Sequence, residues 1–174
     1  MAANKKHPDQ DFKLIPMKKV LIALDYDPTA QKVAEKGFSL AKSMNAEAIL
    51  LHVIAEEIYY SALEYSPIMG FSGFSNTDFS LLANSEGLTK ASQYFLDKTK
   101  RHLHDDTIQT VVEKGDFSEV ILKTAKHLHA DIIVMGSHSR RWLEQILLGS
   151  VTEKVLHNTS IPLFIVPTRK AGSK

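Results

Sequence analysis

The sequence of 174 residues contains no cysteine. That absence excludes disulfide bridges, thiolate metal sites and cysteine nucleophiles. Long hydrophobic runs are absent too: no apolar stretch approaches the roughly 20 residues that a membrane-spanning helix needs, and residues 1–19 hold no apolar core of signal-peptide length. The formal net charge is only +1, which gives no electrostatic case for binding nucleic acid or a membrane surface. We therefore expect a soluble, cytoplasmic protein.

Two widespread nucleotide-binding motifs are also missing. The chain has neither a GxxxxGK[ST] P-loop nor a GxGxxG dinucleotide fingerprint. A catalytic nucleotidyl transferase or ATPase is therefore the hypothesis that the sequence favours least.

The length of the chain predicts a single domain that is large enough to bury its own core. The apolar and charged fractions, 44% and 24%, are ordinary for a soluble globular protein. Residues 1–16 are polar and lack periodicity, which predicts a flexible N-terminal arm. The domain itself is expected over residues 17–167, and a short C-terminal tail over residues 168–174.

Short apolar runs alternate with helical patterns along the domain. The runs predict strands at 20–24, 48–54, 107–112, 131–135 and 162–166, of which the third is more polar and suits a sheet edge. The periodic segments predict helices at 28–44, 85–104, 116–128 and 150–158. Asp27 is expected as the N-cap of the first helix with Pro28 at its first position, and Asp116 with Glu119 resembles a capping box.

This alternation predicts a single doubly wound α/β domain that is Rossmann-like, with a parallel sheet of five strands, helices on both faces and right-handed crossovers. In the strand order 3-2-1-4-5, the direction in which successive strands are added to the sheet reverses between the first and fourth strands, and ligands bind in the crevice at that point. Asp25 follows the first strand and Gly136 follows the fourth. Both are therefore expected to face the same crevice.

The stretch from Asp131 to Ser150 carries the strongest local signal. An apolar run ends at Gly136, a polar and basic loop follows, and Gly149-Ser150 precede a helical pattern. The N-terminus of a helix offers unpaired N–H groups and partial positive charge to an anion. The stretch is therefore typical of a phosphate-binding loop.

The same residues resemble those of universal stress proteins of the UspA-like superfamily. The resemblance covers Lys18 to Val166 and includes the segments KVLIALD, LLHVI, EKGD, ADIIVMGSH and LLGSVTEKVLHNTSIPLFIVP. The ATP-binding branch of that family has the signature glycine, two residues, glycine, nine residues, glycine and then serine or threonine. Gly136, Gly149 and Ser150 match this signature, whereas Ser139 replaces its second glycine.

The resemblance implies a homodimeric, ATP-binding regulatory protein of the stress response, with at most slow hydrolysis and no assigned catalytic residue. Mg²⁺ or Mn²⁺ would arrive with the phosphates rather than in a protein site. Asp25 would contact the nucleoside and Val53 would lie against the adenine. The residues implied for the phosphates and ribose are Met135, Gly136, Ser139, Gly149, Ser150 and Val151. Arg140 and Arg141 could add charge-assisted contacts to the triphosphate.

Ser139 leaves two functions open. If the family glycine adopts a positive φ, a serine there would be strained by roughly 1–2 kcal/mol. If the backbone must touch phosphate, the serine narrows the approach but brings its own hydroxyl. The alternative to ATP binding is a dimeric stress scaffold that binds no nucleotide.

Several of these residues also have purely structural interpretations. Ser150 and Glu153 match a capping box, so Ser150 could simply cap its helix. Asp25 could be a solvated loop carboxylate. The pairs His102/His104 and His127/His129 invite a metal interpretation, but side chains at i and i+2 of a helix point apart, and zinc needs convergent ligands. No metal site is therefore expected.

Residues 56–84 form a long segment rich in tyrosine and phenylalanine, broken by Gly, Pro and Ser. Connections of this length are usually functional or mobile. The segment is either a lid over the site or an excursion packed on the surface.

The fifth strand is wholly apolar, although the strand order places it at an edge of the sheet. A bare apolar edge invites aggregation, so we expect a second subunit to cover it in a C2 homodimer with the two edge strands antiparallel. The expected contact residues are Leu163, Phe164, Ile165 and Val166.

Overall fold

The structure is a computed structural model that describes residues 17–55, 85–137 and 148–168. Its strands are β1 (Lys19–Leu24), β2 (Glu47–Ile54), β3 (Gln109–Lys114), β4 (Ile132–Gly136) and β5 (Leu163–Val166). Its helices are α1 (Ala30–Ser43), α3 (Ser85–His102), α4 (Phe117–His127) and α5 (Ser150–Asn158). The expected N-terminal arm, the aromatic segment 56–84 and residues 138–147 of the expected phosphate loop lie outside the described residues. None of the described helices has the length and apolarity to cross a membrane.

All five strands are parallel and lie in the order β3-β2-β1-β4-β5, as the sequence predicts. The inner strands β1, β2 and β4 are nearly continuous buried apolar runs, as strands covered on both faces must be. The more polar β3 and the short β5 form the two edges. The direction in which successive strands are added to the sheet therefore switches between β1 and β4, which pair in parallel through Val20–Ile22 and Ile132–Val134.

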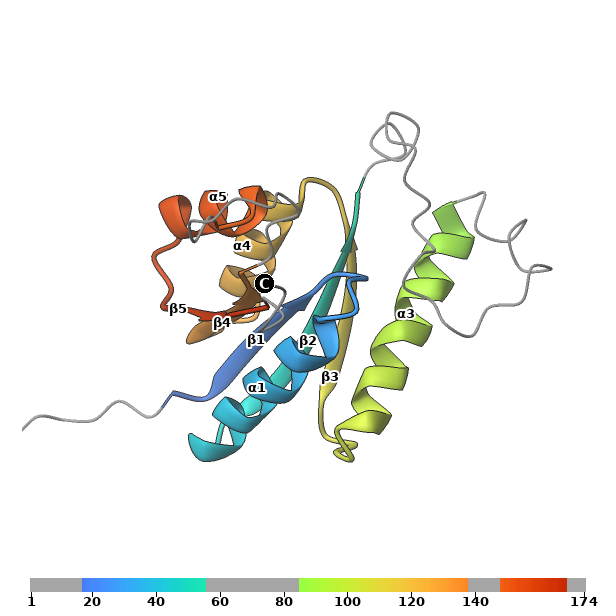
Figure 1. The fold of residues 1–174 in the computed structure, drawn as a ribbon, viewed down its shortest axis with the longest axis horizontal. Coiled ribbons are helices and arrows are strands. Elements are labelled where there is room, and N and C mark those ends of the chain that lie inside the picture. Colours follow the sequence, from blue (N-terminus) through green and yellow to red (C-terminus); the bar gives the residue numbers. More distant parts are fainter. Residues whose placement is uncertain (1–16, 56–84, 138–147, 169–174) are drawn as a thin grey trace, which may run out of the picture.

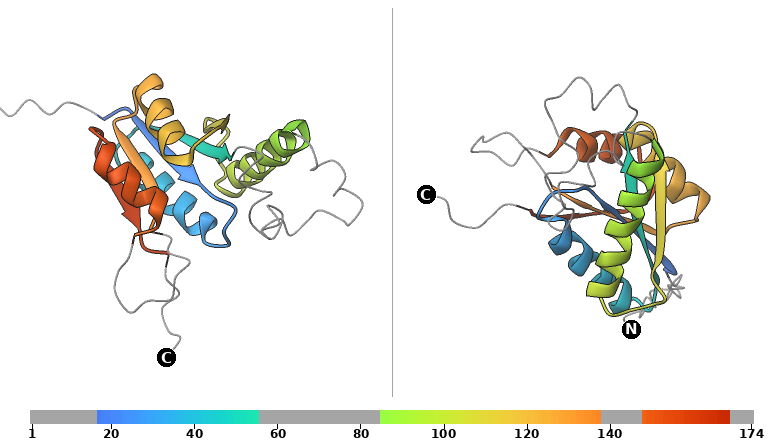
Figure 2. Two further views of the ribbon diagram at one scale, coloured as in Figure 1. Left: turned by 90° about the horizontal axis from the view of Figure 1, so that it is seen from above. Right: turned by 90° about the vertical axis from the view of Figure 1, so that its right-hand side faces the viewer.

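Helices cover both faces of the sheet (Figure 1). α1 and α3 lie on one face and α4 and α5 on the other, as the views from above and from the side in Figure 2 also show. Each layer encloses its own apolar core. Ile22, Leu50 and Val134 of the sheet meet α1 and α3, whereas Leu21 and Ile133 meet α4 and α5.

Asp116 starts α4 as predicted. Its carboxylate accepts hydrogen bonds from the backbone N–H groups of Ser118 and Glu119, at 3.0 and 3.1 Å, and from the Ser118 hydroxyl. These bonds lower the pKa of Asp116, with the Ser118 hydroxyl making the largest contribution. Gly115, just before it, has a φ of +136°, a conformation that favours glycine. The EKGD segment therefore forms the tight turn between β3 and α4: its glycine adopts the positive φ and its aspartate caps the helix.

The first helix begins later than predicted. The Asp27 carboxylate accepts from both the N–H and the hydroxyl of Thr29, at 2.8 and 2.7 Å. This local turn holds Pro28 and Thr29, and the helix starts at Ala30. The expectation that Pro28 opens the helix is therefore wrong, because the carboxylate closes a turn on Thr29 instead of capping the helix directly.

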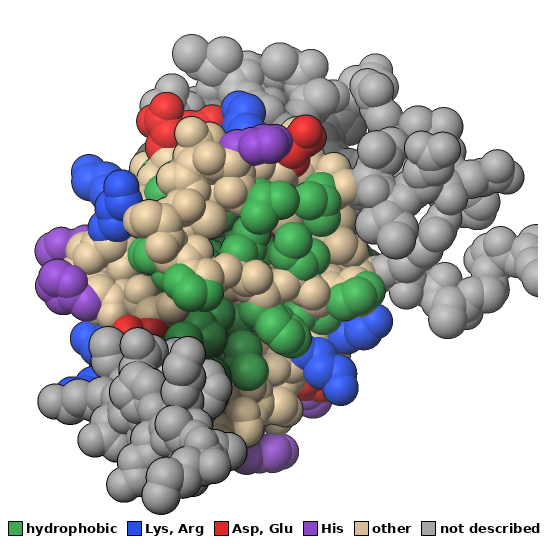
Figure 3. Space-filling view, turned by 90° about the vertical axis from the view of Figure 1, so that its left-hand side faces the viewer, with side chains coloured by type: hydrophobic (Ala, Val, Ile, Leu, Met, Phe, Trp, Pro, Cys, Tyr) green, Lys and Arg blue, Asp and Glu red, His purple; other side chains and the backbone are tan. Residues whose placement is uncertain are grey.

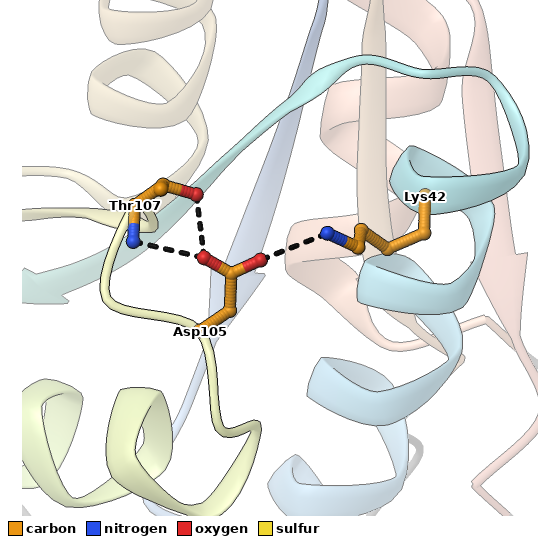
Figure 4. Close-up of polar contacts among 3 residues, drawn as sticks. All are labelled: Lys42, Asp105 and Thr107. Carbon is orange, nitrogen blue, oxygen red and sulfur yellow. Dashed lines mark hydrogen bonds and ion pairs between the residues drawn. The ribbon is translucent and has the colours of Figure 1, made fainter.

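Asp105 explains two further differences. The sequence predicts that the helix runs to His104 and that the next strand begins at Thr107, but α3 ends at His102 and β3 begins at Gln109. Asp105 accepts from the N–H and hydroxyl of Thr107, which holds the connection in a turn (Figure 4). β3 also ends two residues later than predicted, at Lys114 instead of 112, and the remaining ends of the described elements agree with the expectation within one residue.

The same carboxylate links two helices. Its other oxygen lies 3.0 Å from the Lys42 ammonium near the end of α1. The bonds from Thr107, followed by the bond from Lys42, lower the pKa of Asp105 to about 2. Asp105 therefore remains charged at neutral pH, and it ties the α3–β3 connection to α1 at the amino edge of the sheet, away from the expected site.

Candidate functional site

The site predicted from the sequence lies at the carboxyl edge of the sheet. β1 and β4 are neighbours whose connections leave toward opposite sides, so their carboxyl ends border the switch point of the sheet. Asp25 directly follows β1, and Gly136 is the last residue of β4. The fold therefore brings together two features that are far apart in the chain.

Asp25 presents an exposed carboxylate at this edge. It accepts a long hydrogen bond of 3.4 Å from the Asp27 N–H, at the start of the turn that leads into α1. Val53, near the end of the adjacent strand β2, is only 5% exposed, and its side chain belongs to the core under α4 and α5. Val53 can therefore contribute backbone atoms to a ligand, while Asp25 can contribute its side chain.

Met135 and Gly136 end β4 in different surroundings. The Met135 side chain is 5% exposed and packs in the core between the sheet and α4/α5. Gly136 is half-buried, pairs with Val166 of β5, and accepts a hydrogen bond from the Thr152 hydroxyl. The carboxyl end of β4 is thus fixed from both sides.

Gly149 is the N-cap of α5, and within the described part of the chain no side chain caps this helix. Ser150 is the first helical residue and its side chain is exposed. The alternative interpretation, in which Ser150 caps the helix with Glu153, is therefore wrong: the helix begins one residue too early for it. The N–H groups in the first turn of a helix have no partner within the helix.

This helix end has the electrostatics of an anion site. The first-turn N–H groups carry partial positive charge from the helix dipole, and Ser150 and half-buried Val151 supply two of them. The Gly149 N–H donates to the Ser137 carbonyl at 3.3 Å, so the helix starts directly beside the end of β4. Ser139, which the family resemblance also implies, lies outside the described residues, as do Arg140 and Arg141, which were expected to add charge-assisted contacts.

Ser137 and Thr152 complete the described part of the site, and neither residue is marked by a sequence pattern. The Ser137 N–H donates to the Val166 carbonyl at 2.9 Å, and its hydroxyl oxygen accepts from the Thr168 N–H at 3.1 Å. Thr168 is buried by these contacts. The end of β4 is therefore anchored to the residues that follow β5.

His52 is a buried side chain near the same edge of the sheet. In the sequence it stands out only as a polar residue within an apolar strand. It is 4% exposed, and its Nδ1 lies 2.8 Å from the Leu24 carbonyl, just before Asp25. The ring contacts Tyr26 at 4.0 Å and Phe95 at 5.7 Å between centroids. Burial lowers the pKa of His52 to about 4, although the bond to Leu24 opposes this.

The histidines considered as metal ligands lie at or just after the ends of α3 and α4. His104 and His129 have φ of 53° and follow the ends of α3 and α4. His102 instead lies 2.8 Å from Glu35 and links α3 to α1. Within residues 17–55, 85–137 and 148–168, no three potential ligands converge on a metal site.

The fold is that of a doubly wound α/β protein with a helix N-terminus beside the switch point between β1 and β4. The family model of the universal stress protein family matches residues 16–167. The chain therefore belongs to the universal stress protein family.

Similar proteins span nearly the same length. Universal stress protein MJ0577 of Methanocaldococcus jannaschii is 32% identical over 159 residues, which cover 88% of this chain and 97% of that protein. Its solved structure has a TM-score of 0.64 and covers 91% of this chain and all of that chain. Universal stress protein A of Escherichia coli K12 is 25% identical, covering 87% of this chain and 95% of its own.

A third similar protein shares the fold at lower identity. It is a universal stress protein whose structure was solved in complex with cAMP, with a TM-score of 0.57 and 16% identity. The match covers 89% of this chain and all of that chain. At this identity the likeness concerns the fold.

Proposed function

We propose that the protein binds ATP or a related adenine nucleotide at the β1–β4 edge, as a regulatory protein of the stress response. The observation that carries the proposal is the uncapped N-terminus of α5, which starts at Gly149 beside the end of β4. Such a helix end favours a phosphate group. A universal stress protein of the same fold was solved in complex with cAMP, an adenine nucleotide, and this supports an adenine nucleotide as the ligand class.

The described residues divide naturally between the parts of a nucleotide. The N–H groups of Ser150 and Val151 and the Ser150 hydroxyl would hold phosphate oxygens. The Asp25 carboxylate would accept hydrogen bonds from ribose hydroxyls, and the backbone of Val53 would border the base. Mg²⁺ or Mn²⁺ would be carried by the phosphates. Because Asp25 is assigned to binding the ribose and not to activating a water molecule, we propose at most slow hydrolysis of ATP.

We expect ATP with Mg²⁺ to raise the melting temperature of the protein, and Asp25→Ala to remove most of that increase. A ligand that binds only the folded state stabilises it by RT ln(1 + [L]/Kd), about 2.7 kcal/mol at a hundredfold excess over Kd. For a domain of this size that is roughly 5–10 °C. Differential scanning fluorimetry at increasing ATP measures the shift.

Asp106→Ala is the matched control, because Asp106 is an exposed carboxylate in the α3–β3 connection, at the other edge of the sheet. It should keep the full ATP-induced shift. Absence of any shift in the wild type at millimolar ATP would reject nucleotide binding and favour the dimeric scaffold. An equal loss in both variants would place the ligand elsewhere.

We further propose that two copies pair through β5. This strand is an edge of the sheet, as predicted. Of its four residues, Phe164 is 42% exposed, Leu163 and Ile165 are half-buried, and Val166 is buried. Figure 3 shows hydrophobic side chains gathered in the middle of the face on which β5 lies in Figure 1. Leu156 of α5 is a further exposed apolar side chain.

We expect Phe164→Ala to weaken this homodimer by about tenfold, because C2 symmetry removes the buried ring from the interface twice. Sedimentation velocity over a range of protein concentrations measures the change. Tyr94→Ala is the control, since Tyr94 of α3 is an equally exposed aromatic side chain, at 45%. A monomeric wild type, or an equal effect of both substitutions, would contradict pairing through β5.

A further inference from the structure

Two hydrogen bonds join the ends of the segment that connects β4 to α5. The Gly149 N–H donates to the Ser137 carbonyl at 3.3 Å, and the Thr152 hydroxyl donates to the Gly136 carbonyl at 3.0 Å. The bonds use consecutive carbonyls at the end of β4 and the first turn of α5. Because the residues between the two ends number about ten, these contacts fix where a long connection starts and stops.

Thr152 lies in the first turn of α5, where no carbonyl of the helix stands four residues earlier, and its hydroxyl bonds to the strand. A threonine hydroxyl within a helix commonly bonds to the carbonyl four residues earlier, as Thr99 does to Phe95 in α3 at 2.9 Å. Thr152 instead donates outside its helix, to the neighbouring strand. Its side chain is 3% exposed, so the bond is shielded from water. The hydroxyl therefore ties the first turn of α5 directly to β4.

The strand side of this contact is itself held in place. Gly136 is paired with Val166 in the sheet, and Ser137 is bonded to Val166 and Thr168. The Gly136 carbonyl is therefore a fixed point. A bond from Thr152 to that point sets the position of the helix end, and with it the direction in which the Ser150 and Val151 N–H groups point.

We propose that Thr152 is a positioning residue for phosphate binding, which holds the N-terminus of α5 against the end of β4 without touching the ligand. This inference rests on the proposed nucleotide-binding function. A helix end that is already in place binds an anion without first being ordered, so its affinity is higher. The loss of this one hydroxyl is expected to weaken ATP binding by about tenfold.

The test compares ATP binding by isothermal titration calorimetry in four full-length proteins with Mg²⁺ present. Thr152→Val keeps the shape of the side chain and removes the hydroxyl, and should bind about tenfold more weakly than the wild type. Thr152→Ser keeps the hydroxyl and should bind within about twofold of the wild type. Thr99→Val removes a comparable threonine–carbonyl bond in α3 and should leave the affinity unchanged.

Wild-type affinity in Thr152→Val, or an equal loss in Thr99→Val, would overturn the positioning role while leaving nucleotide binding intact. No binding by the wild type would overturn the proposed function and this role with it. Hydrogen exchange gives a readout that needs no ligand and no variant. The Gly149 amide of the free wild type should be protected, and rapid exchange there would overturn the proposal even if Thr152→Val does not fold.

Discussion

Lowering the pH from 7 to 4 is expected to reduce the free energy of unfolding by about 3 kcal/mol through His52 alone. Burial lowers the pKa of His52 from 6.5 to about 4 in the folded protein, and the bond to Leu24 only partly opposes it. In the unfolded chain His52 therefore binds a proton near pH 6.5, whereas in the folded chain it binds one only near pH 4. The contribution of His52 to the free energy of unfolding is fully present above pH 6.5, decreases as the pH falls from 6.5 to 4, and does not change further below pH 4.

The surroundings of the His52 ring explain why its pKa is lowered in the folded protein. The Leu24 carbonyl accepts a hydrogen bond from Nδ1–H, which leaves Nε2 as the unprotonated nitrogen. Nε2 is buried and has no hydrogen-bond partner among the described residues. A charged imidazole would place a second N–H there, beside the rings of Tyr26 and Phe95 and with no acceptor among the described residues.

Urea unfolding at pH 7, 5.5 and 4 measures this effect in the wild type and in His52→Leu, which cannot titrate. The difference in unfolding free energy between pH 7 and pH 4 should be about 3 kcal/mol smaller in the variant. His127→Gln is the control, because His127 is an exposed histidine at the end of α4. If His52→Leu keeps the pH dependence of the wild type, His52 does not titrate as its burial requires.

Replacing Gly149 by aspartate is expected to stabilise the free protein slightly and to weaken ATP binding by roughly a hundredfold. Gly149 has φ −61° and ψ 149°, which any residue can adopt at an N-cap. The new carboxylate would accept the first-turn N–H groups of α5, adding about 0.5 kcal/mol of stability. It would also occupy and repel the position of a phosphate, removing charge-assisted bonds worth about 1.5–3 kcal/mol.

Thermal melts with and without ATP and Mg²⁺ give both quantities in one experiment. Gly149→Asp should melt slightly higher than the wild type without ATP and show almost no ATP-induced shift. Gly149→Ala, which adds a side chain but no charge, should melt slightly lower and keep most of the shift. Unchanged ATP affinity in Gly149→Asp would mean that the phosphates do not bind at this helix end.

The sequence alone was sufficient for the architecture of the protein. Buried strands at 20–24 and 131–135, alternating with amphipathic helices, predicted the parallel sheet, and the orders common to doubly wound sheets led to the strand order that is observed. Asp116 was identified as the cap of α4, and α5 was predicted with the same bounds that it has in the structure. These features follow from local patterns of apolar residues and caps, which act over a few neighbouring residues.

Local patterns failed where a carboxylate or a glycine changed a helix end. Asp27 and Asp105 close turns on the threonines two residues later, and this moved the starts of α1 and β3. Gly149 took the N-cap position that Ser150 could have filled. In each case two local hydrogen-bonding arrangements compete within about 1 kcal/mol, and the surrounding fold selects one.

Only the tertiary structure decided how the site is supported. His52 meets the Leu24 carbonyl 28 residues away, and Thr152 meets the Gly136 carbonyl 16 residues away. Neither contact has a sequence pattern, because each depends on which strands and helices become neighbours after the chain has folded. The sequence thus determined the elements and the family, whereas packing between distant segments determined which buried polar side chains hold the edge of the sheet in place.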